Sequence, residues 1–427
     1  MNEQSSVVDI APLTAPSDNS TAAFDVERIR ADFPILSQTV YGKPLVYLDN
    51  GASAQKPRQV IAAMSDLFET CYSNVHRGVH WTSQKSTEAF ETGRQKVAAF
   101  LNAPSDNEII FTRGATEAIN LVAASWGGAN LNPGDEVILS HMEHHSNIVP
   151  WQILRQQKGI ELKIVPIDDD GNFLFDEYQK MLSEKTKMVA VTHVSNALGT
   201  IVPVVDVIRL AHDKGALVLL DGCQAVPHMA VDVQALDADF YVFSGHKLYG
   251  PTAIGVLWGR EDLLNAMPPY QSGGDMISSV TFEKTTFKKS PHRFEAGTPA
   301  ITEAIGLGAA IDYVGAVGLG NISAHEQGVL QYASERLQAV EGLRIIGQAR
   351  EKASIISFVI DGIHAHDLGT FVDRAGVAVR VGHHCAQPVM ERYGIAATAR
   401  ASFGLYNTRE EVDVLTDALI QAKEFFG

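Results

Sequence analysis

The sequence predicts an α/β protein in which a mostly parallel sheet, covered by helices on both faces, is followed by a smaller α+β domain. Two observations predict the sheet: apolar, β-branched runs recur through the middle of the chain, and helical patterns separate them. A third observation predicts the second domain, because from about Asn321 the pattern changes to a long polar helix, short strands and a closing helix at 409–426.

Six segments are predicted to be strands of the sheet, at 108–112, 136–140, 163–167, 188–194, 217–220 and 240–243. Segment 203–215 opens with Pro, spaces its apolar residues along one face and closes with Lys and Gly, which is typical of a helix. Right-handed crossovers bring the loops after the strands to one sheet edge, where ligands usually bind. We place the large domain at 46–313, the small domain at 24–45 and 314–427, and a flexible tail at 1–23.

The chain of 427 residues carries 34 Lys and Arg against 50 Asp and Glu, a formal net charge of −16. This balance argues against a broad electrostatic contact with nucleic acid or an anionic membrane. The longest purely aliphatic run, 216–220, is far too short to span a bilayer. Three cysteines form no disulfide framework, and residues 1–23 lack the features of a secretory signal. We therefore expect a soluble, cytoplasmic protein that binds neither nucleic acid nor membrane.

Opposite charges follow two of the predicted strands, one crossover apart. Asp221 comes directly after an apolar run, and Lys247 follows the strand at 240–243. Alone, Asp221 is typical of a turn or helix cap, and Lys247 of a solvated surface. Together they match the needs of pyridoxal 5′-phosphate (PLP): an amine that binds the cofactor aldehyde, and a carboxylate that keeps the pyridine nitrogen protonated. The pair therefore predicts a PLP site.

The cofactor phosphate needs a cradle, and segment 108–125 supplies a strand, a turn at Gly114 and the start of a helix. Free backbone N–H groups at the helix start, the helix dipole and the Thr116 hydroxyl suit a dianion. We therefore expect Ala115 and Thr116 to bind the phosphate. Gly and Thr also occur at such turns simply as caps, which leaves that alternative open.

His144 follows the strand at 136–140 and reaches the same sheet edge, where a flat ring can stack on a cofactor. Its neighbours His141, Glu143 and His145 leave a metal site as an alternative. The order H-x-E-H-H, however, matches neither common zinc motif and lacks the helical spacing that brings two histidines together. We therefore expect no metal, and a metal-dependent hydrolase is the remote alternative.

Cys385 lies in the segment VRVGHHCAQP, where Gly382 permits a tight turn. A lone cysteine is most often buried and inert. Here the two preceding histidines and the cation of Arg380 favour the thiolate, so we expect a reactive cysteine on a loop. The other two cysteines, Cys71 and Cys223, are interpreted as packing residues.

Four segments in consistent order and spacing, DGCQAVPH, FSGHKLYGPTAIGVLW, EAGTP and RVGHHCAQP, resemble the group II cysteine desulfurases, the SUF-type enzymes of the class V aminotransferase family. The resemblance covers residues 24–427. It implies fold type I of the PLP-dependent transferases, with a seven-stranded sheet, and a homodimer in which the other subunit completes the active site. The usual text R-S-G-H-H-C-A-M-P differs here at Val381 and Gln387, which we expect to alter loop packing or partner preference.

The resemblance implies a role for each candidate residue. Lys247 would bind the cofactor and remove the Cα proton of the substrate, His144 would stack on the ring, and Cys385 would receive the sulfur. The cofactor would also be held by Ala115, Thr116, Asp221, Gln224, Ser244, His246 and, from the other subunit, Thr298. The substrate carboxylate would be bound by Asn196, Arg400 and the nearby Arg380.

The implied reaction converts L-cysteine to L-alanine and leaves a persulfide on Cys385. A SufE-like or SufU-like protein would accept the sulfur for iron–sulfur cluster assembly by the SUF system. Selenocysteine lyase, or another PLP-dependent amino-acid lyase of the same fold, is the main alternative. A cofactor-free sulfur carrier is a remote one, because it requires the pairing of Asp221 with Lys247 to be accidental.

Overall fold

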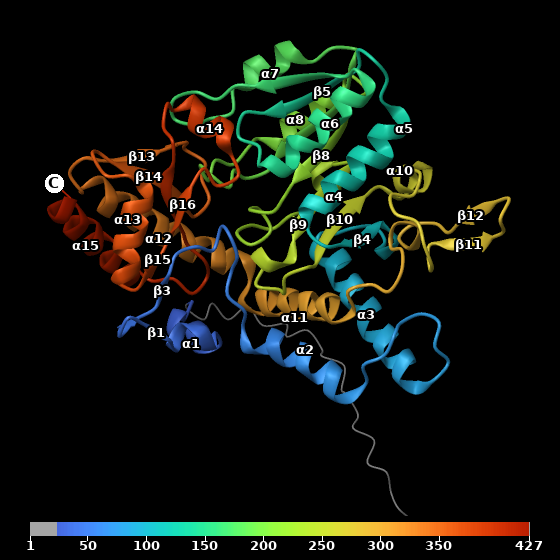
Figure 1. Cartoon of the computed structure of the whole chain (residues 1–427), viewed down its shortest axis with the longest axis horizontal. Helices are drawn as coiled ribbons and strands as arrows, with labels where there is room; N and C mark the ends of the chain where they lie inside the picture. The colour runs from blue at the N-terminus through green and yellow to red at the C-terminus, as the bar shows by residue number, and fades with distance from the viewer. Residues whose placement is uncertain (1–23, 427) are drawn as a thin grey trace, which may run out of the picture.

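The computed structural model describes residues 24–426, so the predicted tail at 1–23 lies outside the described residues. Figure 1 shows a larger part, coloured cyan to yellow, around a central sheet, and a smaller part, orange to red, beside it. Helix α1 (Val26–Ala31) and strand β1 (Thr39–Val40) come first in the chain but lie next to the smaller part. The first elements of the described chain therefore lie on the same side of the molecule as its C-terminal part.

The larger part contains a seven-stranded sheet with the order β4-β10-β9-β8-β7-β5-β6. Its strands are β4 (Ile109–Thr112), β5 (Glu136–Ser140), β6 (Glu161–Val165), β7 (Thr186–Thr192), β8 (Leu217–Asp221), β9 (Phe240–Ser244) and β10 (Gly255–Gly259). β5 to β9 pair in parallel, whereas β10 is antiparallel to both β9 and β4. The predicted, mostly parallel sheet of seven strands is confirmed.

β10 is missing from the six predicted strands because glycines occupy both its ends, a composition that disfavours strands. The fold nevertheless requires Gly255. A Cβ at that position would lie 2.4 Å from the Cα of Gly114, in the turn after β4. The close approach of the two backbones places this turn against the sheet edge.

Helices cover both faces of the sheet (Figure 1). On one face pack α2 (Arg58–Thr70), α3 (Trp81–Phe100), α8 (Val204–His212) and α11 (Ile301–Val317), and on the other α4 (Ala115–Val122) and α6 (Val149–Lys158). The buried residues of β8 alternate accordingly, with Val218 and Leu220 in the first core and Leu219 in the second. Because both faces are covered, the charged and hydroxyl residues of β5 and β8 lie at the strand ends.

The smaller part is an antiparallel sheet with the order β13-β14-β17-β16. It consists of β13 (Leu343–Ile346), β14 (Ile355–Ile360), β16 (Arg380–Gly382) and β17 (Thr398–Ser402), with α12 (Leu319–Gln338), α13 (Ala365–Arg374) and α15 (Arg409–Phe426) packed on it. The predicted boundary after residue 313 lies inside α11, which continues to Val317 and stops at Gly318, a residue with φ +87°. β3 (Val46–Tyr47) pairs in parallel with β15 (Val377–Ala378), so residues 46–47 join the smaller part.

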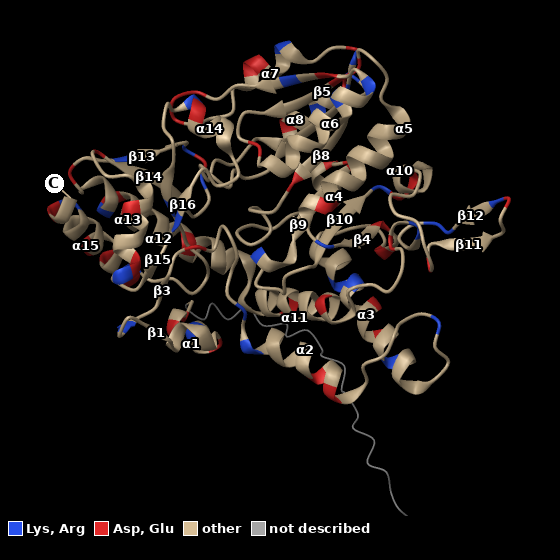
Figure 2. Ribbon diagram, in the orientation of Figure 1, with Lys and Arg blue, Asp and Glu red and all other residues tan. Residues whose placement is uncertain are grey.

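Charged side chains are spread over the surface. In Figure 2, Lys and Arg alternate with Asp and Glu along helices and loops rather than gathering on one element. Within residues 24–426, no single helix is both long enough and apolar enough to cross a bilayer. Only α11 and α12 taken together are long and apolar enough, and the two helices are bent by 75° relative to each other.

A buried ion pair anchors the EAGTP segment to the sheet. Arg94 on α3 is 1% exposed and donates two hydrogen bonds to the Glu295 carboxylate, at 2.7 and 2.8 Å. Glu295 also accepts from the backbone N–H of Phe111 in β4. Without Glu295, Arg94 loses two charged hydrogen bonds but keeps the carboxylate of Glu91, 2.8 Å from its Nε. The N–H of Phe111 loses its acceptor as well. We therefore expect Glu295→Ala to lower the free energy of unfolding by about 2 kcal/mol.

Urea denaturation measures this loss. The matched control is Lys96→Ala, which breaks an exposed ion pair with Asp312 between α3 and α11. The control is expected to change the free energy of unfolding by less than about 1 kcal/mol. Equal effects of the two substitutions would contradict the anchoring role of Glu295.

Candidate active site

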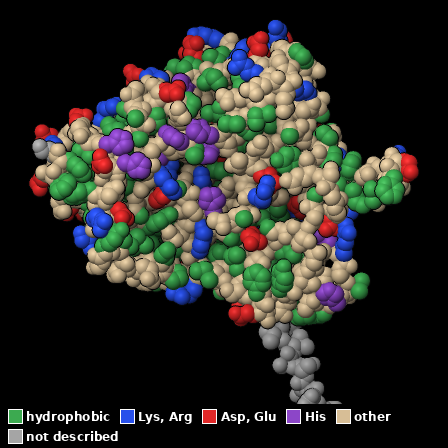
Figure 3. Space-filling view, viewed as in Figure 1, with side chains coloured by type: hydrophobic (Ala, Val, Ile, Leu, Met, Phe, Trp, Pro, Cys, Tyr) green, Lys and Arg blue, Asp and Glu red, His purple; other side chains and the backbone are tan. Residues whose placement is uncertain are grey.

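One cavity of about 620 Å³ lies at the sheet edge where the parallel strands end, between the larger and smaller parts. Figure 3 shows this face, with histidine side chains near the opening and Lys and Arg side chains beside them. Twelve of the predicted site residues line the cavity: Ala115, Thr116, His144, Asn196, Asp221, Gln224, Ser244, His246, Lys247, Arg380, Cys385 and Arg400. The remaining one, Thr298, does not.

Adjacent strands position Asp221 and Lys247. Asp221 is the last residue of β8, and Lys247 ends the single turn of 3₁₀ helix that follows β9. Because β8 and β9 are parallel neighbours, both side chains enter the cavity from the same sheet edge. Asp221 is 5% exposed and accepts from the backbone N–H of Cys223 at 3.0 Å, which orients its carboxylate. The structure thus brings the two predicted charges into one cavity.

The turn after β4 forms a cradle that suits a phosphate. Gly114 in this turn has φ +155°, a backbone conformation that residues with a side chain rarely adopt. The N–H of Ala115 donates to Ser244 Oγ at 2.9 Å, and Thr116 follows in the first turn of α4. Hydroxyl groups, backbone N–H groups and a helix N-terminus together make a donor set for a dianion. These residues fit the phosphate of PLP.

Two further predicted cofactor ligands line the same cavity. Gln224 is 2% exposed and donates from Nε2 to the carbonyl of Gly51 at 2.7 Å. His246 directly precedes Lys247, and burial, together with the charges on Lys247 and Lys56, lowers the pKa of His246 to about 4. His246 is therefore neutral at pH 7 and offers one ring N–H as a hydrogen-bond donor.

His144 is held as a neutral ring at the cavity wall. Burial, followed by the charge on Lys247, lowers the pKa of His144 to about 4. Its Nδ1 accepts from the backbone N–H of Ser146 at 3.1 Å, so the proton of the neutral ring lies on Nε2. A flat ring fixed in this way can cover one face of a cofactor and exchange a proton through Nε2.

The neighbouring Glu143 points away from this site. It is 0% exposed and accepts from Asn147 and from the N–H of Thr192 in the core. Among residues 24–426 no group of three His, Cys, Asp or Glu side chains is placed to hold a metal ion. The orientation of Glu143 gives the metal-dependent alternative no support.

Cys385 lies at the cavity mouth on a loop with left-handed backbone geometry. Both His384 and Cys385 have φ +53°, a conformation that non-glycine residues rarely adopt. Two hydrogen bonds from the larger part hold the loop. The N–H of His145 donates to the Cys385 carbonyl at 2.7 Å, and Nδ2 of Asn196 donates to the His384 carbonyl at 2.6 Å. Cys385 itself is exposed, as a nucleophile that delivers its product outward must be.

The expectation that both preceding histidines favour the Cys385 thiolate is wrong for His384. Burial, with the charges on Arg400 and Arg380, lowers the pKa of His384 to about 2. Its Nε2 forms a 2.7 Å hydrogen bond with Oγ1 of Thr398. His384 is therefore neutral and adds no positive charge beside the thiol.

The other two cysteines lie away from the cavity mouth. Cys71 is half-buried at the C-terminus of α2. Cys223 is buried, and burial, with the charge on Asp221, raises the pKa of its thiol to about 12. Cys223 also lines the cavity, a position that the sequence did not predict for it.

Buried histidines also give stability a dependence on pH. Burial lowers the pKa of His193 to about 4, whereas a histidine in the unfolded chain titrates near 6.5. Between these values the unfolded chain binds a proton that the folded protein does not, so stability falls as the pH falls. As the pH falls between about 6.5 and 4, we expect the free energy of unfolding of wild type to decrease by up to about 1.4 kcal/mol per pH unit more than that of His193→Asn. Urea denaturation at pH 7, 6 and 5 measures both slopes, and identical slopes would contradict the prediction.

Two arginines form the end of the cavity in the smaller part. Arg380 in β16 stands directly opposite Arg400 in β17. Arg400 is 2% exposed and donates from Nη1 to the Asn196 carbonyl at 2.9 Å, while its Nε has no hydrogen-bond partner within residues 24–426. An unpartnered donor on a buried guanidinium suits a carboxylate ligand. The structure therefore fits substrate binding by Asn196 and Arg400.

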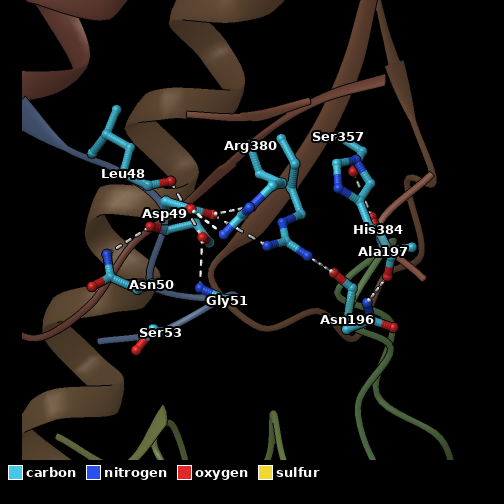
Figure 4. A network of polar contacts seen from close by, with 12 residues as sticks. Leu48, Asp49, Asn50, Gly51, Ser53, Asn196, Ala197, Ser357, Arg380 and His384 are labelled. Atoms are coloured by element: carbon cyan, nitrogen blue, oxygen red, sulfur yellow. Dashed lines mark hydrogen bonds and ion pairs between the residues drawn. The ribbon is translucent and has the colours of Figure 1, made fainter. Parts of the chain in front are cut away.

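Asp49 belongs to this end of the cavity but was not among the predicted residues. Figure 4 shows its carboxylate facing Arg380, with Asn196 and His384 nearby. Oδ2 lies 2.9 Å from Nη2 of Arg380, and Oδ1 lies 3.4 Å from Nη2 of Arg400. The sequence carries a signal for it, because Asp49 follows the apolar run LVYL just as Asp221 follows its own strand.

Thr298 is exposed and lines a second hollow of about 270 Å³. Arg113 and Glu117 at the start of α4 line the same hollow. The expected contact of Thr298 with a cofactor involves another subunit, and it stays a prediction.

A PLP-dependent enzyme of fold type I is the class of protein that this sheet, this pair of opposite charges and this phosphate cradle define. The sequence model of the class-V aminotransferase family matches residues 46–415. The cysteine desulfurase of Synechococcus elongatus is 52% identical over 96% of the chain, which spans 66% of that relative's length. The Escherichia coli cysteine desulfurase is 51% identical, over 95% of the chain and 100% of the relative. The crystal structure of the E. coli cysteine desulfurase CsdA has a TM-score of 0.89 at 38% identity and covers 95% of this chain and 100% of that one.

The chain belongs to the class-V aminotransferase family and, within it, to the cysteine desulfurases, the PLP-dependent enzymes that take sulfur from L-cysteine. The resemblance seen in its four motifs, the fold type and the cofactor are thereby confirmed.

Proposed function

We propose that this chain converts L-cysteine to L-alanine through a persulfide on Cys385 and passes the sulfur to an acceptor protein for iron–sulfur cluster assembly. The observation that carries the proposal is the placement of Cys385 at the mouth of the cavity that also holds Lys247, Asp221 and Arg400. An amine, a carboxylate and a guanidinium inside, with a thiol at the opening, suit sulfur abstraction from a free amino acid.

The chain's own groups divide the work. Arg400 and Asn196 hold the substrate carboxylate, which orients the reacting end of the amino acid toward Lys247. The Lys247 amine takes the proton from Cα and returns one later, and neutral His144 exchanges protons through Nε2. When bound, PLP would supply the electron sink for the substrate carbons, and the Asp221 carboxylate would keep the ring nitrogen protonated.

Sulfur transfer balances without an external oxidant. The thiolate of Cys385 attacks the substrate sulfur, so a sulfur–sulfur bond forms on Cys385 as the bond between Cβ and sulfur breaks. The electron pair of the broken bond stays with Cβ of the substrate. Cβ is then protonated, which gives L-alanine and leaves the enzyme with a persulfide on Cys385.

Arg400 is expected to set substrate affinity. In Arg400→Lys the planar fork of donors is lost, because a lysine is a single point charge on a flexible stem. We expect KM for L-cysteine to rise about 10- to 100-fold, with a smaller change in kcat. Steady-state kinetics of alanine formation measure both. The control is Arg209→Lys on the exposed surface of α8, and an Arg400→Lys enzyme with unchanged KM would remove Arg400 from substrate binding.

We also propose that the acceptor is a SufE-like or SufU-like protein that approaches the Cys385 face. The exposed position of Cys385 supports this. Alanine formation is to be measured with each acceptor alone and with both. Marked stimulation by one of them is the expected result, and no response to either would overturn the assignment.

A homodimer and a cytoplasmic location complete the proposed function. The exposed Thr298 beside its hollow supports a second subunit, and three unpaired cysteines support a reducing compartment. Sedimentation of the purified protein and fractionation of cells that produce it test the two statements. A monomer at micromolar concentration, or recovery outside the cytoplasm, would contradict them.

A further inference from the structure

The loop that carries Cys385, residues 382–387, is contacted twice by His145, a residue of the larger part. The His145 N–H donates to the Cys385 carbonyl at 2.7 Å, and the ring nitrogen Nε2 accepts from the Gln387 N–H at 3.1 Å. These two contacts lie on either side of Ala386. One residue therefore spans the segment that directly follows the nucleophile.

The loop needs such contacts because its backbone is strained. His384 and Cys385 both have φ +53°, a conformation that non-glycine residues rarely adopt and that persists only where surrounding contacts hold it. The bond from Asn196 ends on the His384 carbonyl, before the nucleophile. Both bonds of His145 lie at the nucleophile or after it, so His145 fixes the C-terminal side of the loop.

The ring contact requires a neutral imidazole. Because Nε2 accepts a hydrogen bond, the proton of the His145 ring lies on Nδ1. Burial, followed by the charge that His383 carries when protonated, lowers the pKa of His145 below its ordinary value. The titratable groups around the ring are those of His383, 5.4 Å away between ring centroids, of His144, 6.3 Å away, and the thiol on the bonded loop. A protonated ring has donors on both nitrogens and cannot accept from Gln387.

We propose that His145 is a positioning residue that fixes the Cys385 thiol for attack on the substrate sulfur by holding the loop on both sides of Ala386. This role rests on the proposed function, in which Cys385 is the nucleophile. His145 is not among the residues that line the cavity, so its effect acts through Cys385. Placement matters because a displacement of a reacting group by about 1 Å can lower a rate about 10²-fold.

Two substitutions isolate the ring contact. His145→Gln carries an amide oxygen at about the reach of Nε2, so it can still accept from the Gln387 N–H, whereas the amide of His145→Asn is one bond shorter. The rate of the first turnover of L-cysteine to L-alanine measures the effect without an acceptor protein. At saturating L-cysteine we expect this rate to fall at least about tenfold in His145→Asn and to stay within about threefold of wild type in His145→Gln.

Two further measurements distinguish positioning of the thiol from a general structural role. The L-cysteine concentration for half-maximal rate, and the Kd of L-alanine from the visible absorbance of the bound cofactor, should change less than about twofold in both variants. Because a protonated ring cannot accept, the ratio of the wild-type rate to the His145→Gln rate should fall at least about threefold from pH 8 to pH 5. The matched control is His364→Asn at the exposed N-cap of α13, where asparagine is an equally good cap, and it should change none of these quantities.

The proposal is overturned if His145→Asn keeps the wild-type rate, or if His145→Gln loses as much as His145→Asn, because the acceptor atom is then not what matters. A higher half-maximal L-cysteine concentration at an unchanged rate would assign His145 to substrate binding instead. If His145→Asn does not fold, the pH comparison of wild type with His145→Gln decides, and parallel profiles reject the proposal. Failure of the proposed function would look different, because wild type itself would form no L-alanine from L-cysteine.

Discussion

Replacing Cys385 with serine is expected to reduce alanine formation from L-cysteine at least about 10³-fold while the enzyme keeps the absorbance of its cofactor. The substitution changes one atom, the sulfur that attacks the substrate sulfur, and an alkoxide cannot store sulfur as a persulfide. Cys385 is exposed on its loop, and its recorded hydrogen bonds are made by its backbone: its carbonyl accepts from the N–H of His145, and its N–H donates to Nδ1 of His383. Folding and cofactor binding should therefore survive.

Alanine production with an acceptor present, and mass spectrometry of the enzyme after incubation with L-cysteine, measure the effect. Wild type should gain the mass of one sulfur atom on Cys385, and Cys385→Ser should gain none. Cys71→Ser is the control, because Cys71 lies at the end of α2 outside the cavity. Full activity of Cys385→Ser would rule out the persulfide route. Activity toward selenocysteine in the same variant would show that selenium leaves by a different route.

Lys247→Arg is expected to lower the rate of alanine formation from L-cysteine at least about 10³-fold, through a different defect. A guanidinium keeps the positive charge but is never deprotonated in proteins, so it can neither bind the cofactor aldehyde nor take the Cα proton. The surrounding fold gives no reason for misfolding, since Lys247 is half-buried at the end of a single helical turn.

Borohydride reduction distinguishes this defect from simple loss of affinity. In wild type the reagent should fix the cofactor covalently on the peptide that contains Lys247, and in Lys247→Arg it should fix none, even with excess cofactor. Lys56→Arg is the control, because that lysine bonds to the carbonyl of His246 and does not line the cavity. A covalent adduct on another lysine of wild type would contradict the assignment.

The two variants also separate the two halves of the reaction. Cys385 acts at the cavity mouth, on a loop of the smaller part, whereas Lys247 belongs to the edge of the large sheet. Arg400 and Asn196, which we propose to hold the substrate carboxylate, line the same cavity. Sulfur abstraction therefore requires both parts of the molecule to keep their relative placement, and the hydrogen bonds from His145 and Asn196 to the cysteine loop join them.

Local pattern in the sequence was enough to predict six of the seven strands of the large sheet and the residues that follow them. Asp221 comes directly after a short apolar run, and the Gly114 turn and Lys247 follow theirs within four residues. The carboxyl ends of parallel strands share one edge, so these three features had to meet once the strands were recognised. The closing helix was predictable for the same reason, since its periodicity and ends are local.

Tertiary structure alone decided the features that depend on pairs of residues far apart in the chain. The opposition of Arg380 to Arg400 follows from strand register, and Asp49 reaches them because β3 pairs with β15. The neutral state of His384 follows from burial beside Arg400. β10 pairs with β9 and β4 although it begins and ends with a glycine. Its first glycine, Gly255, is required because a side chain there would collide with the backbone of Gly114. Periodicity reports which face of an element is buried, whereas register, burial and charge pairing are set only when the elements pack together.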